Sequence, residues 1–266
     1  MDKEGSGGRL TPFEMVFGVE RLAEEEFPAI AEEARARAIT VERPSGFAQL
    51  ERVAALLQRL LPENVEPGAF ERYVEVAYHC FHFWKAGCPL LVLEAALIRD
   101  LVESPPDLRG WRIRSASPAY YLELPKNLFW AGIVGDAPPE PVEGIFLKLD
   151  PEDPAGEVRL LLVLGMRPQR YGFSAAGLAA DLGRARDLDE PAAFRSDLPG
   201  ADLAKLYSLS RNSEGLLLVL RLLWYLGMYP ESLERVKAGS GAVTEDLDAA
   251  TALDYCKVRL IERSRG

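Results

Sequence analysis

The segment Ser104-Pro105-Pro106-Asp107-Leu108-Arg109-Gly110 separates two halves of the sequence that differ in patterning. Two adjacent prolines and a glycine cannot continue a helix or a strand ladder, so the chain must turn there. Apolar residues recur at helical spacing before this segment and alternate with polar residues after it. We therefore predict an α+β fold, with a helical subdomain over 1–104 and a mainly antiparallel β-sheet with one or two packed helices over 105–266. A single integrated domain is the alternative.

The second half is predicted to supply most of the strands. Apolar and polar residues alternate over 111–115 and 120–124, which is typical of two half-buried antiparallel strands. Further strands are predicted at 127–134, 144–149, 158–164 and 255–261. Helices are predicted at 175–182, at the strongly apolar 214–226, and briefly after Pro230.

The first half is predicted to be helical after a flexible tail of about ten residues. The expected helices are 15–38 with an interruption at Pro28, 45–61, 67–85 and 90–102. The last of these is apolar on almost every side, so we expect other elements to surround it. Gly87 and Pro89 separate it from the helix before it.

Both histidines lie in one aromatic stretch, Tyr78-His79-Cys80-Phe81-His82-Phe83-Trp84. At 100° per residue, His79 and His82 share a helix face with Glu75, while Cys80 points toward the apolar side. Glu75, His79 and His82 are residue types that bind metals, and a second helix would have to complete such a site. The alternatives are a solvated face with a Glu75–His79 pair, or a surface that docks on the second half.

Arg221 interrupts the apolar helix predicted at 214–226. A guanidinium in that position either extends to the surface along its aliphatic stem or needs a buried partner. Binding of an anion by Arg221 is the functional prediction, and structural pairing is the alternative.

A basic and aromatic region spans residues 109–130. Its basic residues are Arg109, Arg112, Arg114 and Lys126, and its aromatic residues include Trp111, Phe129 and Trp130. Such residues form stacking platforms in nucleic-acid-binding sheets. However, strand alternation places Trp111 opposite Arg112 and Arg114, which favours a core role for the aromatic side. The formal charge of -10 also makes a nucleic-acid partner unlikely.

Composition narrows the cellular setting. Hydrophobic residues make up 48% of the 266 residues, enough for a sizeable core. Three cysteines without a CxxC pair fit a reducing compartment, and no apolar stretch reaches the length of a membrane span. We therefore expect a cytoplasmic protein with no membrane partner.

The leading functional hypothesis is a non-enzymatic binding or interaction protein whose partner is a protein or a small ligand. No cofactor is expected under this hypothesis. The first alternative is a hydrolase that uses a divalent metal on Glu75, His79 and His82. The second is nucleic-acid binding through the region Arg109–Trp130.

Overall fold

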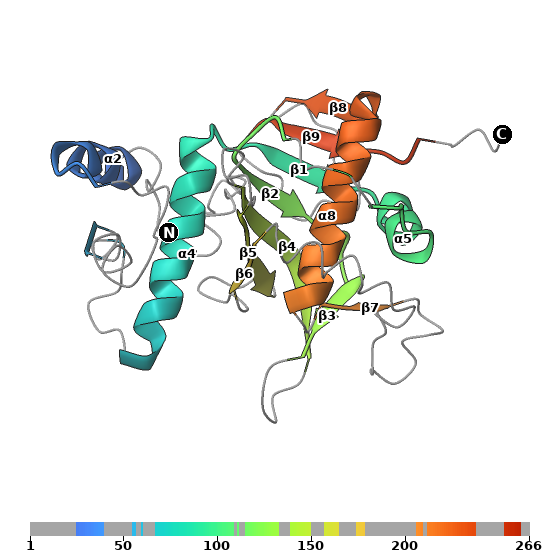
Figure 1. Ribbon diagram of the computed structural model, residues 1–266, viewed down its shortest axis with the longest axis horizontal. Helices are drawn as coiled ribbons and strands as arrows, with labels where there is room; N and C mark the ends of the chain where they lie inside the picture. The colour runs from blue at the N-terminus through green and yellow to red at the C-terminus, as the bar shows by residue number, and fades with distance from the viewer. Residues whose placement is uncertain are drawn as a thin grey trace, which may run out of the picture.

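The computed structural model shows one nine-stranded mixed sheet with helices on both faces (Figure 1). The strands of its main path run in the order β6-β5-β4-β2-β1-β9-β8. The structure describes residues 25–39, 55–56, 60, 67–108, 111, 115–132, 139–149, 157–164, 174–178, 206–209, 212–237 and 253–261. The helices are α2 (Phe27–Ala36), α4 (Pro67–Lys85), α5 (Ala95–Glu103), α8 (Asn212–Met228) and the 3-10 helix η3 (Pro230–Ser232).

The strands come from both halves of the sequence. They are β1 (Leu90–Leu93), β2 (Ala119–Glu123), β3 (Phe129–Ala131), β4 (Glu140–Leu149), β5 (Glu157–Leu164), β6 (Ser174–Leu178), β7 (Tyr207–Ser208), β8 (Leu233–Val236) and β9 (Tyr255–Val258). The pairs β1–β2, β1–β9 and β3–β7 are parallel, and the other five are antiparallel. The predicted α+β class with a mainly antiparallel sheet is therefore confirmed.

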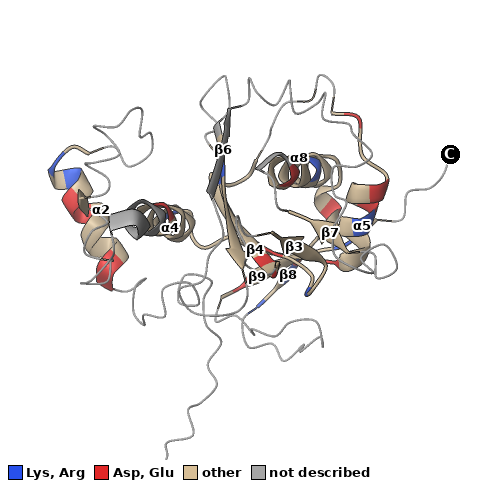
Figure 2. Ribbon diagram, turned by 90° about the horizontal axis from the view of Figure 1, so that it is seen from below, with Lys and Arg blue, Asp and Glu red and all other residues tan. Residues whose placement is uncertain are grey.

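Figure 2 shows the layers: α2 and α4 lie on one side of the sheet, and α5 and α8 lie on the other. Because successive side chains of a strand point to opposite faces, each strand contributes to two cores. Tyr121 and Phe146 belong to the core under α4, whereas Leu122 and Ile145 belong to the core under α8. Two apolar clusters, one on each face, thus hold the helices against the sheet.

Helix α4 has the bounds predicted from the sequence. It ends at Lys85, and Gly87 two residues later has a φ of +84°, the left-handed conformation that glycine adopts without steric cost. On its outer side, Phe81 contacts Phe27 of α2 at a ring-centroid distance of 6.0 Å. On its inner side, Phe83 lies 5.6 Å from Phe146 of β4 and 6.2 Å from Tyr121 of β2. The helix is therefore covered on two sides.

The predicted helix over 90–102 is wrong, because its first four residues form β1 and only 95–103 are helical. All four residues of β1 are buried, and the strand lies between β2 and β9. A short apolar run does not show by periodicity whether it is a strand or a buried helix. Strand β1 therefore lies inside a sheet that is built largely from residues after 105.

Two further predictions for the second half differ from the structure. Residues 174–178 form strand β6, which pairs with β5, instead of the start of a helix. The short helix after Pro230 is the 3-10 helix η3, and strand β8, which no sequence pattern predicted, follows it. Pro28 lies at the start of α2 and does not interrupt it. The helix predicted over 45–61 and the strand predicted over 111–115 lie mostly outside the described residues.

None of the helices in the described ranges is long and apolar enough to cross a membrane. The most apolar of them, α8, carries Arg221 and Glu214 among its buried residues.

Candidate functional site

Strand β8 forms one end of the sheet and pairs only with β9 among the described strands (Figure 1). Leu233, Glu234 and Arg235 are exposed. An edge strand of this kind carries backbone groups that another chain can pair with. What β8 can bind therefore depends on which of its backbone groups face outward.

The hydrogen-bond pattern of β9 fixes the direction of each backbone group in β8. Arg259 N–H donates to Ser232 O at 3.1 Å, and the β8–β9 register places these two residues opposite each other. Hydrogen-bonded and non-hydrogen-bonded pairs alternate along an antiparallel ladder. Leu233 and Arg235 therefore belong to non-hydrogen-bonded pairs, and their backbone groups point away from β9. The carbonyl of Val258, opposite Leu233, also points away from β8, because it accepts from the N–H of Glu94, the residue after β1, at 3.3 Å.

Three backbone groups are consequently unpaired at the outer edge within the described part of the chain. They are the carbonyl of Leu233 and both the N–H and the carbonyl of Arg235. The N–H of Leu233 is not among them, because it donates to Pro230 O at the end of η3. These groups offer one donor and two acceptors to an added strand.

Two exposed apolar residues occur in the chain just before and at the start of this strand. Met228 ends α8 and is 54% exposed, and Leu233 begins β8 and is 39% exposed. Among the residues that the structure describes, these two are the exposed large hydrophobic side chains. Leu233 lies opposite Val258, which belongs to the core under α8, so Leu233 points to the α8 side of the sheet. Arg235, two residues on, points to the same side.

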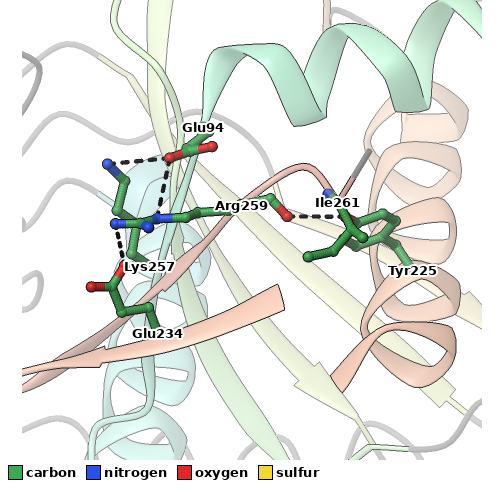
Figure 3. Close-up of polar contacts among 6 residues, drawn as sticks. All are labelled: Glu94, Tyr225, Glu234, Lys257, Arg259 and Ile261. Carbon is green, nitrogen blue, oxygen red and sulfur yellow. Dashed lines mark hydrogen bonds and ion pairs between the residues drawn. The ribbon is translucent and has the colours of Figure 1, made fainter. Parts of the chain in front are cut away.

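An ion-pair network holds β8 and β9 on the other side of the sheet (Figure 3). The carboxylate of Glu94 lies 3.2 Å from the Lys257 ammonium and 3.7 Å from Nε of Arg259. Arg259 also pairs with Glu234 of β8. The edge strand is thereby linked through β9 to the residue that follows β1.

The chain after β9 is held by Tyr225 of α8. Its hydroxyl donates to Arg259 O at 2.9 Å and accepts from Ile261 N–H at 2.7 Å (Figure 3). Tyr225 is fully buried. These hydrogen bonds fix the chain after β9, the strand that pairs with β8, against α8.

The two histidines do not lie on a solvated face, and that alternative from the sequence is wrong. His79 and His82 are each 4% exposed, because α4 is covered by both α2 and the sheet. Glu75 is exposed. Among the residues that the structure describes, no three His, Cys, Asp or Glu side chains are grouped so that they could hold a metal ion. Nothing in the geometry therefore favours a metal on Glu75, His79 and His82.

His79 faces the basic end of the sheet surface under α4, which we define as His79, Lys148 and Arg159. Lys148 and Arg159 are directly opposed on β4 and β5, and the Arg159 guanidinium carbon lies 5.7 Å from the Tyr78 ring centroid. Burial, together with the charges of Arg159 and Lys148, lowers the pKa of His79 to about 3. Nδ1 of His79 has no hydrogen-bond partner within the described residues. The imidazole is therefore neutral at physiological pH.

The opposite end of the same sheet surface is acidic, and we define it as Glu123 and Glu143. Glu123 ends β2, on the same side of the sheet as Tyr121. Burial and the neighbouring Glu143 raise the pKa of Glu123 to about 7, while Lys126 acts in the opposite direction. This carboxyl group therefore exchanges its proton near neutral pH.

Arg221 is 4% exposed and links α8 to the end of α5. Its Nη1 donates to Leu101 O at 3.0 Å and to Val102 O at 3.4 Å. Carbonyls in the last turn of a helix lack helical partners, so a guanidinium satisfies them. These contacts give Arg221 a structural role, and anion binding by Arg221 stays a prediction.

The basic and aromatic region is only partly described. Arg109, Arg112 and Arg114 lie outside the described residues. Trp111 packs against the core under α8, and Trp130 Nε1 donates to Asn127 O at 3.2 Å. These contacts agree with the predicted core role of Trp111.

The sequence reasoning missed the edge of β8. The only signal was Pro230 followed by Leu233, Arg235 and Lys237 alternating with Glu234 and Val236, a pattern too short to identify a strand.

No protein-family model matches the sequence, and no curated protein matches it either. Among solved structures, the chain is similar to the crystal structure of AcrVA2 with a TM-score of 0.46 and 10% sequence identity. The similarity covers 89% of this chain and 79% of that chain.

Proposed function

We propose that this chain is a non-enzymatic interaction protein that pairs an extended segment of a partner protein with the outer edge of β8. One observation carries the proposal: the Leu233 carbonyl and both backbone groups of Arg235 face outward without hydrogen-bond partners in the described structure. Addition of a strand to a free sheet edge is a recurring mode of peptide recognition. Charge and cysteine usage support a cytoplasmic setting.

The side chains next to the edge support the proposal that β8 binds a partner. Backbone hydrogen bonds contribute only about 0.5–1.5 kcal/mol each, so side chains must supply the remaining affinity. Leu233 provides exposed apolar surface on one side of the edge. On the other side, the pair between Glu234 and Arg259 fixes the strand before a partner arrives. A preformed edge lowers the entropic cost of binding.

Selection from a random peptide library displayed on phage tests the proposal. The bait is the full chain, and selected peptides are then compared on two variants of one position. Arg235→Pro removes the outward N–H and leaves the β8–β9 ladder intact, because that N–H does not bond to β9. Arg235→Ala removes the same side chain but keeps the N–H.

We expect peptides that bind the wild type and Arg235→Ala but lose about tenfold or more in affinity for Arg235→Pro, equivalent to about 1.4 kcal/mol. Amide hydrogen exchange in the free protein should show fast exchange at Arg235 and slower exchange at Glu234 and Val236, whose N–H groups face β9. Peptides that bind Arg235→Pro as well as Arg235→Ala would overturn the proposal, as would a selection that enriches none.

A further inference from the structure

We infer that the segment paired with β8 belongs to a different protein and carries an acidic residue opposite Arg235 with an apolar residue opposite Leu233. This inference rests on the proposed function and adds the chemistry of the partner. It follows from the sides to which the residues of β8 point, and from the symmetry that a second copy would have to obey.

The α8 side of β8 sets the pattern of the partner. Leu233 and Arg235 both point to this side, and both are exposed. Directly opposed residues of paired strands point to the same side, and opposite charges there contribute about 0.2–1 kcal/mol. An acidic residue therefore fits opposite Arg235. An apolar residue two positions along covers Leu233, whose side chain is 39% exposed.

The other side of β8 makes a smaller demand on the partner. Glu234 already pairs with Arg259, and on β9 it lies opposite Lys257. Val236 lies opposite Tyr255. An uncharged residue opposite Glu234 and a β-branched residue opposite Val236 therefore suffice. The expected antiparallel pattern is β-branched, acidic, uncharged, apolar.

A second copy of this chain fits poorly as the occupant. Two antiparallel edge strands in one sheet are related by a two-fold axis perpendicular to the sheet. Opposed residues must point to the same side of the sheet, so the axis must lie midway between one residue and the same residue of the second copy. Centred on Glu234 it opposes two carboxylates, and centred on Arg235 it opposes two guanidinium groups. Centred on Val236 it places Arg235 opposite Lys237 of the copy, and centred on Leu233 it would pair the strand with the 3-10 helix η3, which is not extended. Like charges directly opposed are destabilising, so the edge discourages self-pairing.

Titration with two synthetic peptides tests the inference. The first peptide, acetyl-Ser-Val-Glu-Thr-Ile-Lys-amide, has the expected pattern, and the second replaces its Glu with Lys. Each is added to the full chain, and to Arg235→Glu, while the amide resonance of residue 235 is followed by NMR. This substitution keeps the outward N–H and reverses only the side-chain charge.

We expect the wild type to bind the Glu peptide about tenfold more tightly than the Lys peptide, and Arg235→Glu to reverse this preference. Equal affinity of the two peptides, or a preference that Arg235→Glu leaves unchanged, would overturn the inference. Sedimentation equilibrium supplies the second arm: a dimer abolished by Arg235→Pro would identify the occupant as a second copy.

The two proposals fail in different ways. Library peptides that depend on the N–H of Arg235 but lack the acidic and apolar pattern would contradict the partner chemistry and leave edge pairing in place. Peptides that ignore Arg235→Pro would remove both.

Discussion

The basic end and the acidic end of the sheet surface under α4 shift the pKa of a buried side chain in opposite directions. At the basic end, Lys148 and Arg159 lie beside the buried His79, and the pKa of this imidazole falls to about 3. At the acidic end, burial and Glu143 raise the pKa of Glu123 to about 7. At each end burial, reinforced by a neighbour of like charge, disfavours ionisation, so His79 stays neutral and Glu123 keeps its proton up to about pH 7. The charged groups under α4 are buried and affect the stability of the fold, whereas those on β8 are exposed and accessible to a partner.

The largest effect is expected where the two ends meet. Phe83 is fully buried between them, against Tyr121 and Phe146. Phe83→Ala should lower the free energy of unfolding by about 3–5 kcal/mol, because it removes a ring and leaves a cavity. Urea denaturation measures the loss. A similar loss at every pH is expected, since Phe83 does not titrate, and a loss that varied strongly with pH would show that the two ends are coupled through it.

His79→Phe should change the dependence of stability on acid. The folded pKa of His79 is about 3, below its ordinary value of 6.5, so the unfolded chain binds the proton more readily. The contribution of neutral His79 to the free energy of unfolding is therefore fully present above pH 6.5. It is lost as the pH falls toward 3, by at most about 1.4 kcal/mol per pH unit. His79→Phe should remove this loss. Urea denaturation between pH 4 and pH 8 measures it, with Phe83→Leu as a control that does not titrate.

Glu123→Gln should have the opposite effect. The folded pKa of Glu123 is about 7, above its ordinary value of 4.5, so the folded chain keeps the proton longer. This contribution to stability is complete below pH 4.5 and is lost as the pH rises through 7, by at most about 1.4 kcal/mol per pH unit. Glu123→Gln should remove this contribution, so that the stability of the variant rises as the pH increases from 4.5 to 6.5. Between pH 4.5 and pH 6.5 the two groups offset each other, so the wild type should be flatter than either variant, and a wild-type curve as steep as a variant's would contradict the comparison.

The sequence predicted elements well where one periodicity ran long enough. The helix over 67–85 and the apolar helix around Arg221 were both found, because each repeats its pattern over four turns or more. Leu90 to Leu93 failed because four apolar residues have no readable period. Their identity as a strand depends on β2 and β9, which lie far along the sequence.

The candidate site was harder to predict than the fold. The helical period correctly placed His79 and His82 on one face of the helix. It could not show that this face is buried by other parts of the chain. The charges that act on His79 come from Arg159 and Lys148, about seventy to eighty residues away in sequence. The edge of β8 is harder still, because the position of a strand at the end of a sheet depends on the order of all the strands.

The smallest effect is expected at the half-exposed ion pairs of β8 and β9. Arg259 and Glu234 have side chains 52% and 48% exposed, so water and salt weaken their attraction. Arg259→Met keeps most of the aliphatic stem, and its backbone bonds to Ser232 and Tyr225 remain. We expect a loss of about 0.2–1 kcal/mol in the free energy of unfolding at low salt, and less at high salt. A loss above about 2 kcal/mol that salt did not reduce would place this network with the buried charges of the basic end, and would mean that β8 is held as part of the core rather than as an accessible edge.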